Sequence, residues 1–497
     1  MRTTALALSV VFLLACAHAA AGESASDDTQ ACLECHATAT PGIVADWSKS
    51  RHAGVLPGEA MKKPALQKRI SAKTVPEGLA GTTVGCAECH AMRPEAHPDA
   101  FDHEGFRVYT IVTPSDCAVC HPEEADQYSQ NLMSNAYGNL MDNPLYRDLM
   151  KSINGMQRFE KGRTVTEDAD EMTRADSCLH CHGTRIGIEG VRKVETDFGE
   201  MEFPALTGWP NQGVGRINPD KSMGACTSCH ARHGFSIEMA RKPYTCSQCH
   251  KGPDVPAYKV YEVSKHGNIH SSLGKHWDFT AVPWTAGKDF QAPTCAACHA
   301  SLLVDSEGTT IAKRTHRMND RLDWRILGLV YAHPRPKSPD TSIIKNKGGL
   351  NLATELTGEP VVEFLIDEKQ QMANRRAMKT VCLACHSTPW VDGHFVRFDN
   401  TVKTTNAMTL TATQVLLSAW EKGAAMGPGQ GDSPFNEAIE KMWVELWLFY
   451  ANSTRYASAM SGADYGVFAN GRWYMSKTIQ EMLDHLEFKL EQTKKKK

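Results

Sequence analysis

The sequence has no excess of charge of either sign. It contains 54 basic and 57 acidic side chains, for a net charge of -3. Nucleic-acid-binding proteins normally carry a basic excess, so we expect no nucleic-acid partner. Hydrophobic residues make up 41% of the chain and charged residues 22%, which excludes wholesale disorder. With 497 residues, the chain has the length of about three average domains.

Three further features are missing or rare. After the first two dozen residues, no apolar run is long enough to span a bilayer. Strand-like alternation of polar and apolar residues is rare, which favours a mainly α fold. No segment recurs at a fixed period. The abundant residues are instead 17 Cys, 21 His and 20 Met, and so many cysteines must be disulfides, metal ligands or cofactor attachments.

The N-terminus has the features of an export signal over residues 1–22. Arg2 precedes a short apolar stretch, residues 5–14, that is too short to cross a membrane. Ala17-His18-Ala19 suits an ordinary signal peptidase. Residues 13–16 resemble a bacterial lipobox, in which Cys16 would carry a lipid anchor. We favour removal of Cys16 with the signal, and in either case we expect a periplasmic or otherwise exported protein.

All the other cysteines belong to eight Cys-x-x-Cys-His motifs, the attachment signature of c-type haem. The two thiols bond to the porphyrin, and the histidine becomes the proximal ligand of the iron. A zinc ribbon or a redox dithiol would not need a histidine at the same position eight times. We therefore expect eight covalently attached haem c groups. The motifs, numbered 1 to 8 below, comprise Cys32, Cys35 and His36; Cys86, Cys89 and His90; Cys117, Cys120 and His121; Cys178, Cys181 and His182; Cys226, Cys229 and His230; Cys246, Cys249 and His250; Cys295, Cys298 and His299; and Cys382, Cys385 and His386.

The motifs begin 20 to 87 residues apart, so the chain is not a tandem array of one haem module. The density is about one haem per 60 residues. Since a porphyrin is a large apolar disc, the cofactors would supply much of the core. Folding should therefore depend on haem attachment, as it depends on metal in other metalloproteins.

Eight irons need up to eight distal ligands, and twelve histidines lie outside the motifs and the signal. The count allows eight doubly ligated irons or one iron with an open position. His233 is three residues beyond His230, so it would serve a neighbouring haem. His97 and His103 compete for one role, for which we take His103. The predicted distal ligands are His52, His103, His233, His266, His316 and His333, whereas His180 and His485 are expected to be structural and His270, His276 and His394 stay unassigned.

The chain divides by composition into a haem region, residues 23–400, and a helical region without cysteine, residues 401–497. A capping-box pattern at Thr411–Gln414 predicts the start of a helix. Residues 423–433 are rich in glycine and should end it, and Pro434 can open the next helix. The apolar stripes of the last two helices comprise Ile439, Met442, Trp443, Leu446, Trp447 and Tyr450, and then Ile479, Met482, Leu483, Leu486 and Leu490.

The chain resembles the octahaem hydroxylamine oxidoreductase family of multihaem cytochromes c. The clearest stretch, residues 226–267, holds motif 5 with His233, motif 6 with Asp254, and Ser264-Lys265-His266-Gly267. Eight motifs followed by C-terminal helices match as well, so the resemblance covers nearly the whole mature chain. It implies a mainly helical fold with closely packed haems, long C-terminal helices and a homotrimer.

The resemblance also implies one catalytic haem without a distal protein ligand, which we assign by position to motif 5 and His230. Oxidising members have an Asp-His pair after the next motif. Asp254 matches the aspartate, but Val255 stands where the histidine is expected. A pocket tyrosine is also expected, and Tyr331 lies at a plausible spacing. The predicted catalytic residues are thus His230, Asp254 and Tyr331.

Oxidising members further cross-link a C-terminal tyrosine to the catalytic porphyrin of a neighbouring subunit. Tyr465 and Tyr474 are the candidates, but the expected Trp-His-Gly is absent, and ordinary packing is favoured for both. These departures favour the reductive direction, from nitrite or hydroxylamine to ammonium, with an electron-transfer protein of the periplasm or membrane as partner. Hydroxylamine oxidation is the first alternative, and an electron conduit with eight doubly ligated haems is the second. Reduction of sulfur oxyanions is a minor possibility.

Overall fold

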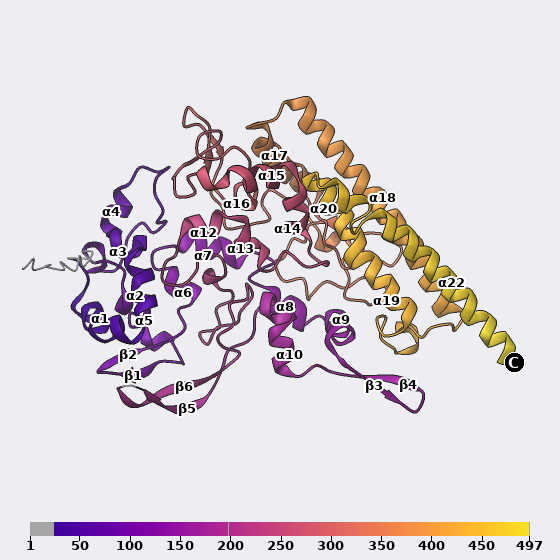
Figure 1. Cartoon of the computed structure of the whole chain (residues 1–497), viewed down its shortest axis with the longest axis horizontal. Coiled ribbons are helices and arrows are strands. Elements are labelled where there is room, and N and C mark those ends of the chain that lie inside the picture. Colours follow the sequence, from indigo (N-terminus) through magenta and orange to yellow (C-terminus); the bar gives the residue numbers. More distant parts are fainter. Residues whose placement is uncertain (1–23, 197, 497) are drawn as a thin grey trace, which may run out of the picture.

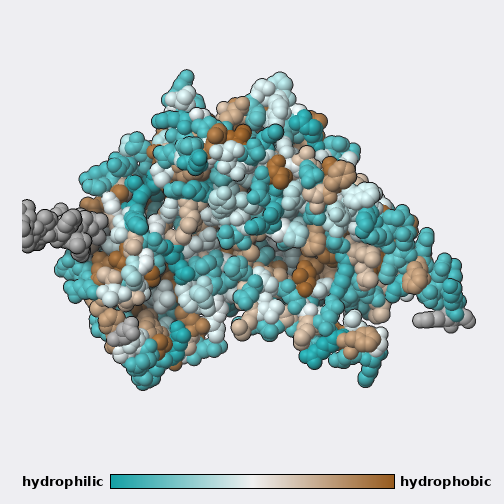
Figure 2. Space-filling model, viewed as in Figure 1, coloured by the Kyte–Doolittle hydropathy of each residue, from teal (hydrophilic) through white to brown (hydrophobic). Residues whose placement is uncertain are grey.

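The structure is a computed structural model that describes residues 24–196 and 198–496 (Figure 1). The expected signal and Cys16 lie outside the described residues. None of the described helices is both long and apolar enough to cross a membrane. The chain progresses from short N-terminal helices at one end of the molecule to long C-terminal helices at the other (Figure 1). The face in Figure 2 is largely hydrophilic, with small and separate apolar patches.

Short helices carry most of the haem motifs. Motif 1 lies inside α1 (Asp27–Ala39), and motifs 2, 4 and 7 each form a single helical turn. One turn of about four residues brings both cysteines and the histidine close to one another. Motif 3 begins at the end of α6 (Pro114–Cys117), motif 5 begins in η3 (Cys226–Ser228), and motif 8 follows from α17 (Glu368–Leu383). The three single-turn helices are α5 (Cys86–His90), α11 (Cys178–His182) and α16 (Cys295–His299).

The remaining helices of this region are also short, and proline lies in the first turn of several of them, where its missing N–H costs nothing. The α-helices are α2 (Pro41–Ser48), α3 (Arg51–Gly54), α4 (Pro57–Lys62), α7 (Pro122–Ser129), α8 (Ala136–Met141), α9 (Pro144–Asn154), α10 (Glu171–Asp176), α12 (Ile237–Arg241), α13 (Pro243–Ser247), α14 (Ala257–Val263) and α15 (Lys265–Leu273). The 3-10 turns are η1 (Leu79–Gly81), η2 (Pro94–Ala96), η4 (Gly274–His276) and η5 (Val362–Phe364).

Strands are few and form small separate sheets. Three antiparallel hairpins are β1 (Phe101–His103) with β2 (Phe106–Val108), β3 (Met156–Glu160) with β4 (Arg163–Glu167), and β5 (Gly187–Thr196) with β6 (Gly199–Thr207). A three-stranded sheet comprises β7 (Trp284–Thr285), β8 (Leu303–Val304) and β9 (Thr310–Ala312). The pair β10 (Trp324–Arg325) and β11 (His333–Pro334) sets Arg325 opposite His333. The prediction of a mainly α fold is confirmed.

The C-terminal helices enclose the largest apolar core. The helix α18 (Thr388–Glu421) packs against α20 (Asn452–Met460) and α22 (Arg472–Lys496). The helix α19 (Ala438–Val444) continues through a π-helical segment, η7 (Glu445–Ala451), into α20, and η6 (Pro428–Gln430) and α21 (Ala463–Val467) are short. Most of the predicted apolar stripe is buried here, including Ile439, Trp443, Leu446, Trp447 and Met482.

The predicted helix start at Thr411–Gln414 is wrong. The helix α18 begins at Thr388, with a proline in its first turn, and runs without a break across residue 400. Thr411 lies inside it, and its hydroxyl donates a hydrogen bond to the carbonyl of Ala407. A threonine can satisfy its hydroxyl in this way within a helix, so the capping pattern alone did not mark a terminus. The glycine-rich break is confirmed, and the next helix starts at Ala438 rather than at Pro434.

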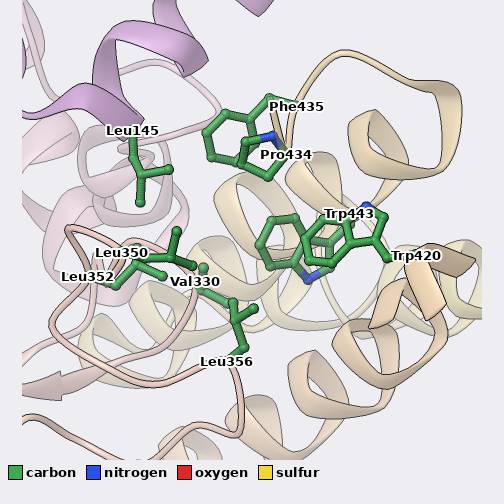
Figure 3. Close-up of a pocket in the computed structure, with 9 residues that line it drawn as sticks. All are labelled: Leu145, Val330, Leu350, Leu352, Leu356, Trp420, Pro434, Phe435 and Trp443. Carbon is green, nitrogen blue, oxygen red and sulfur yellow. The ribbon is translucent and has the colours of Figure 1, made fainter. Parts of the chain in front are cut away.

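A small apolar cavity lies between α9, α18 and α19 (Figure 3). Its volume is about 10 Å³, which is close to the space of a single water molecule. Its walls include Leu145, Val330, Trp420 and Trp443, and they expose no polar atoms to it. This cavity is therefore a packing void and not a substrate site.

Candidate functional site

Four motif histidines face a second histidine from a distant part of the chain. The ring centroids are 6.1 Å apart for His36 and His103, and 6.4 Å apart for His52 and His121. They are 6.5 Å apart for His230 and His316, and 6.0 Å apart for His266 and His386. A metal ion with bonds of about 2 Å to both imidazoles fits between rings at this separation. The geometry at motifs 1, 3, 5 and 8 therefore fits two histidine ligands for each iron.

The protonation of these histidines suits iron ligation. Burial lowers the pKa of His52, His230 and His316 to about 4, and nearby histidines lower it further for His52 and His230, so these rings are neutral at pH 7. The Nδ1 atom of His90 lies 2.8 Å from the carbonyl oxygen of Tyr109. That of His182 lies 3.3 Å from the carbonyl oxygen of Ala136. An Nδ1–H donor in these contacts leaves the Nε2 lone pair for a metal.

The cysteines also fit covalent haem attachment. All 16 cysteines in the described part of the chain are free, so the motifs do not form disulfides. In the same part of the chain, no three or more His, Cys, Asp or Glu side chains converge on a possible metal site. A zinc ribbon would require such a cluster. Haem requires only a pair of thiols and axial histidines, which is the donor set present.

Cysteines of different motifs lie beside one another and define the order of the haem attachments. Cysteines of motifs 1 and 2, of motifs 3 and 5, and of motif 6 with both motif 4 and motif 7 lie close enough to shift one another's pKa. Cysteines of motifs 2 and 3, 5 and 6, and 7 and 8 lie within electrostatic range of each other. The attachments therefore follow the order 1-2-3-5-6-7-8, and motif 4 branches from motif 6.

The structure brings Asp254 to motif 4 and not to motif 5. The carboxylate of Asp254 acts electrostatically on His182, on Cys178 and on His250 of the neighbouring motif 6. The groups that act on His230 are instead three histidines and Glu124. Because His316 faces His230, the geometry does not support the assignment of an open position to motif 5. We assigned the catalytic haem from the order of the motifs along the chain. In the folded protein, however, motif 4 lies beside motif 6, which the order of the motifs does not reveal.

Two arginines and a tyrosine complete the surroundings of Asp254. Arg325 acts on His182, and Arg325, Arg335 and Asp254 all act on the phenol of Tyr456. Burial raises the pKa of Tyr456 to about 12, so its hydroxyl stays protonated. Burial and the charge of Arg325 lower the pKa of Arg335 to about 9, which leaves it cationic at pH 7. The side chain of Asn452 fixes the segment by donating a hydrogen bond to the carbonyl of Asp254.

We call Asp254, Arg325, Arg335 and Tyr456 the motif-4 cluster. Asp254 and Arg325 act on His182, and Arg335 joins them through Tyr456. A carboxylate, two guanidinium groups and a phenol in one cluster can attract an anion and supply protons. Of these four residues, only Asp254 was predicted from the sequence. Arg325 and Arg335 come from the segment around β10 and β11, and Tyr456 comes from α20. No local pattern marks these three residues, since only the tertiary fold brings them together.

Tyr331 lies in the core of the C-terminal helices. It is 1% exposed, and its hydroxyl donates to the carbonyl of Leu356, with Thr413 Oγ1 at 2.9 Å. A hydroxyl held by these partners serves packing, so the structure gives Tyr331 no place in the motif-4 cluster. Tyr474 stacks on Tyr450 with ring centroids 5.1 Å apart, and Tyr465 is partly exposed on α21. Within this chain, neither candidate for a cross-link lies against a haem motif in any described contact.

The remaining predicted ligands divide into two cases. His233 lies within electrostatic range of His90, so it belongs beside motif 2, and it adopts an unusual positive φ of 70°. Such backbone strain in a non-glycine residue is typical of functional positions. His333 is buried against Arg325, Arg335 and Arg455, and it is not among the four facing pairs.

His97 is held by two carboxylates and not by a metal site, which leaves the role opposite His36 to His103.

Comparisons with known proteins identify the class of protein. Residues 215–320 match the family model "Seven times multi-haem cytochrome CxxCH", and residues 116–202 match "Cytochrome c554 and c-prime". A solved structure described as a hypothetical multiheme protein is 40% identical, with a TM-score of 0.88 over 94% of this chain and 96% of that one. The chain is thus a multihaem cytochrome that binds haem c covalently.

Two proteins of Kuenenia stuttgartiensis refine the relationship. A probable nitrite reductase-hydroxylamine oxidoreductase fusion protein is 28% identical over 285 residues, which are 54% of this chain and 25% of that protein. The chain therefore spans about a quarter of the curated relative that it matches. A structure titled as a reducing HAO-like protein complex has a TM-score of 0.59 at 18% identity, over 94% of this chain and 85% of that one, and shares the fold. The chain is thus a multihaem cytochrome that is similar to a hydroxylamine oxidoreductase fusion protein over part of its sequence and to a HAO-like complex in its fold.

The pairing of His230 with His316 can be tested directly. In the variant His316→Ala, the haem of motif 5 should lose its distal ligand and change from low-spin to high-spin ferric iron. Electron paramagnetic resonance should then show one low-spin signal fewer and one high-spin signal more than the wild type. The matched control is His485→Ala on α22. An unchanged spectrum of His316→Ala would contradict the pairing.

Proposed function

We propose that the chain is an exported octahaem cytochrome c that reduces nitrite, hydroxylamine or both to ammonium. We assign the reaction to the haem of motif 4, attached through Cys178 and Cys181 with His182 as its proximal ligand. The observation that carries this proposal is the motif-4 cluster, of which Asp254 and Arg325 act directly on His182, while His316 faces His230. The haems, when bound, supply stored electrons and one open coordination position.

The arginines favour an anionic substrate. Arg335 is 6% exposed, and Arg325 is half-buried on β10. Positive charges in a site shielded from water attract anions strongly, since the local dielectric is low. Nitrite is an anion and hydroxylamine is uncharged at neutral pH, so the arginines should matter mainly for nitrite.

Proton delivery is the role of Asp254 and Tyr456. Reduction of nitrite to ammonium consumes six electrons and eight protons, so groups that donate protons are required beside the substrate. A positioned carboxyl group typically accelerates such steps by about 10²–10⁴-fold. The phenol of Tyr456 lies within electrostatic range of Asp254 and can supply a further proton or a hydrogen bond.

Hydroxylamine oxidation is the alternative enzymatic function. It would use the same Asp254 as a base, but Val255 takes the place of the second titratable group, and Tyr474 packs on Tyr450. The other alternative is an electron conduit in which every iron has two histidine ligands. A homotrimer, a periplasmic location and an external electron-transfer partner complete the proposal and rest on the family resemblance.

Asp254→Asn removes the proposed acid while it preserves the shape of the side chain. Turnover of nitrite and of hydroxylamine should fall by roughly 10²-fold, since both reductions need protons. The matched control is Asp464→Asn, an exposed aspartate on α21. Turnover would be assayed with an artificial electron donor over a range of pH. Wild-type rates with an unchanged pH profile would remove Asp254 from this role.

Arg335→Gln tests the preference for an anion. The KM for nitrite should rise on the order of 10-fold, because a hydrogen bond to a charged group contributes about 1.5–3 kcal/mol. The KM for hydroxylamine should change little. Lys251→Gln, an exposed residue beside motif 6, is the control for general surface charge. Equal effects of Arg335→Gln on the two substrates would argue against anion recognition by this residue.

A further inference from the structure

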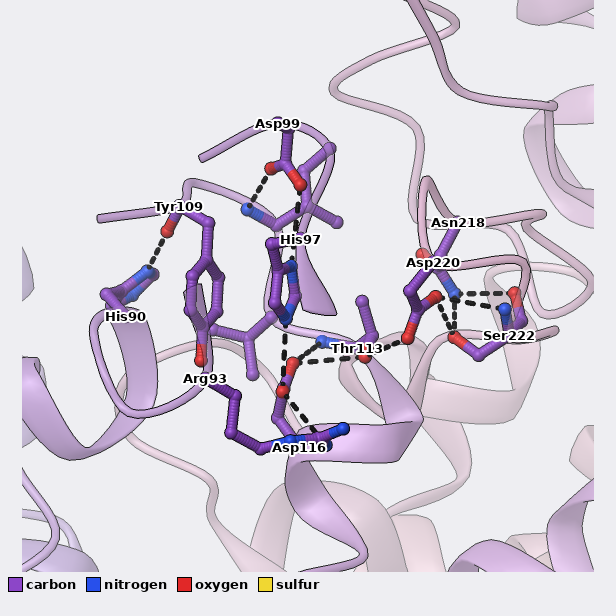
Figure 4. A network of polar contacts seen from close by, with 12 residues as sticks. His90, Arg93, His97, Asp99, Tyr109, Thr113, Asp116, Asn218, Asp220 and Ser222 are labelled. Carbon is purple, nitrogen blue, oxygen red and sulfur yellow. Dashed lines mark hydrogen bonds and ion pairs between the residues drawn. The ribbon is translucent and has the colours of Figure 1, made fainter. Parts of the chain in front are cut away.

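A buried polar network lies between motifs 2 and 3, outside the motif-4 cluster (Figure 4). Its centre is His97, which is 4% exposed and stacks flat on Tyr109 with ring centroids 3.4 Å apart. His97 Nε2 lies 3.1 Å from Asp116 Oδ1, and its Nδ1 lies 3.4 Å from Asp99 Oδ1. Both carboxylates are buried, at 6% and 1% exposed. One imidazole thus bridges two buried carboxylates.

The network holds the proximal ligand of motif 2. The Tyr109 ring stacks on His97, and the Tyr109 backbone pairs with His90 in two places. Its carbonyl oxygen lies 2.8 Å from His90 Nδ1, and its N–H donates to the His90 carbonyl at 2.9 Å. Proximal histidines are oriented by such partners, which also tune the electron density of the ligand. The position of His97 is therefore coupled to the iron ligand of motif 2.

The same network also lies at the start of motif 3. Asp116 Oδ2 accepts hydrogen bonds from the N–H and the hydroxyl of Thr113 and so caps α6, and the next residue, Cys117, is the first thiol of motif 3. The Thr113 hydroxyl also lies 2.9 Å from Asp220 Oδ2, in the loop before motif 5. Asp116 therefore stands between the haem attachments of motifs 2 and 3, which are consecutive along the path.

The charges of the network balance only when His97 is protonated. Burial alone would lower the pKa of His97, but its hydrogen bond to Asp116 and the nearby carboxylate of Asp99 outweigh this effect and raise the pKa to about 9. Arg93 adds a second cation, 3.4 Å from Asp116 Oδ1. Two cations then match the two carboxylates that His97 contacts, Asp99 and Asp116. Without the charge of His97, one buried negative charge would remain beside two haems.

We propose that His97 is a positioning residue that, through Tyr109 and Asp116, sets the reduction potentials of the haems of motifs 2 and 3. An uncompensated negative charge near an iron stabilises its ferric form and lowers its potential, and a low dielectric strengthens the effect. His97 keeps the two potentials high enough for electrons to pass between motifs 1 and 5. This role depends on haem attachment alone and is independent of the proposed substrate.

The test is a potentiometric titration of the purified holoprotein, followed by optical and electron paramagnetic resonance spectra. The variant His97→Gln keeps an N–H donor near the Nε2 position but carries no charge. Two of the haem midpoint potentials should shift to lower values while the others stay in place. The double variant His97→Gln with Asp99→Asn removes one charge of each sign and should bring the two potentials back. His485→Gln, far from this network on α22, is the control.

A second variant covers the case in which His97→Gln does not fold. Arg93→Gln also leaves one unmatched carboxylate, and since the Arg93 side chain is 33% exposed, it should cause a smaller shift in the same direction. If both variants leave every midpoint unchanged, or if the double variant does not reverse the shift, the proposal is wrong. A uniform shift of the midpoint potentials of all the haems would also reject the proposal, because the charge of His97 would then not act preferentially on motifs 2 and 3.

Discussion

The structure depends on pairs of facing histidines from distant parts of the chain, which we propose as the two axial ligands of a haem iron. Each motif supplies its cysteines and one histidine within a single turn, but the second histidine comes from elsewhere. His316 lies 86 positions after His230, and His266 lies 120 positions before His386. Each such pair closes a long loop, which costs entropy that the bonds to iron must offset.

This constraint explains why the haem region has so little regular structure of its own. Its helices are short, and its strands form small hairpins, because the cofactors and their ligands hold the segments together. The C-terminal helices are the exception. Their core contains Trp443, Leu446, Trp447 and Met482 and needs no cofactor, so they provide a rigid wall against which the haem region packs. From these helices, Asn452 donates a hydrogen bond to the carbonyl of Asp254, and Tyr456 contributes its phenol to the motif-4 cluster.

The order of the attachments gives the site its place in electron flow. Seven motifs form one continuous path, and motif 4 stands beside motif 6 as a branch. A reaction on a branch can draw electrons from both directions of the path without interrupting it.

Local patterns in the sequence were sufficient to predict the haem-attachment motifs and the apolar stripes of the C-terminal helices. Every haem motif could be read directly, because attachment needs a fixed spacing within one turn. The distal histidines were harder, since His97 and His103 differ only in their tertiary neighbours: His97 meets two carboxylates, and His103 meets His36. The position of Asp254 beside His182, and of Tyr331 in the helical core, depends on how distant segments cross, which no local spacing encodes.

We propose that one iron has an open position and that it serves as the reaction site. The most direct measurement is electron paramagnetic resonance of the fully oxidised protein, in parallel and perpendicular modes, with and without nitrite. We expect one high-spin ferric centre that nitrite converts to low-spin, while the other signals stay unchanged. A spectrum that is low-spin throughout and indifferent to nitrite would contradict this proposal and would identify the protein as an electron conduit.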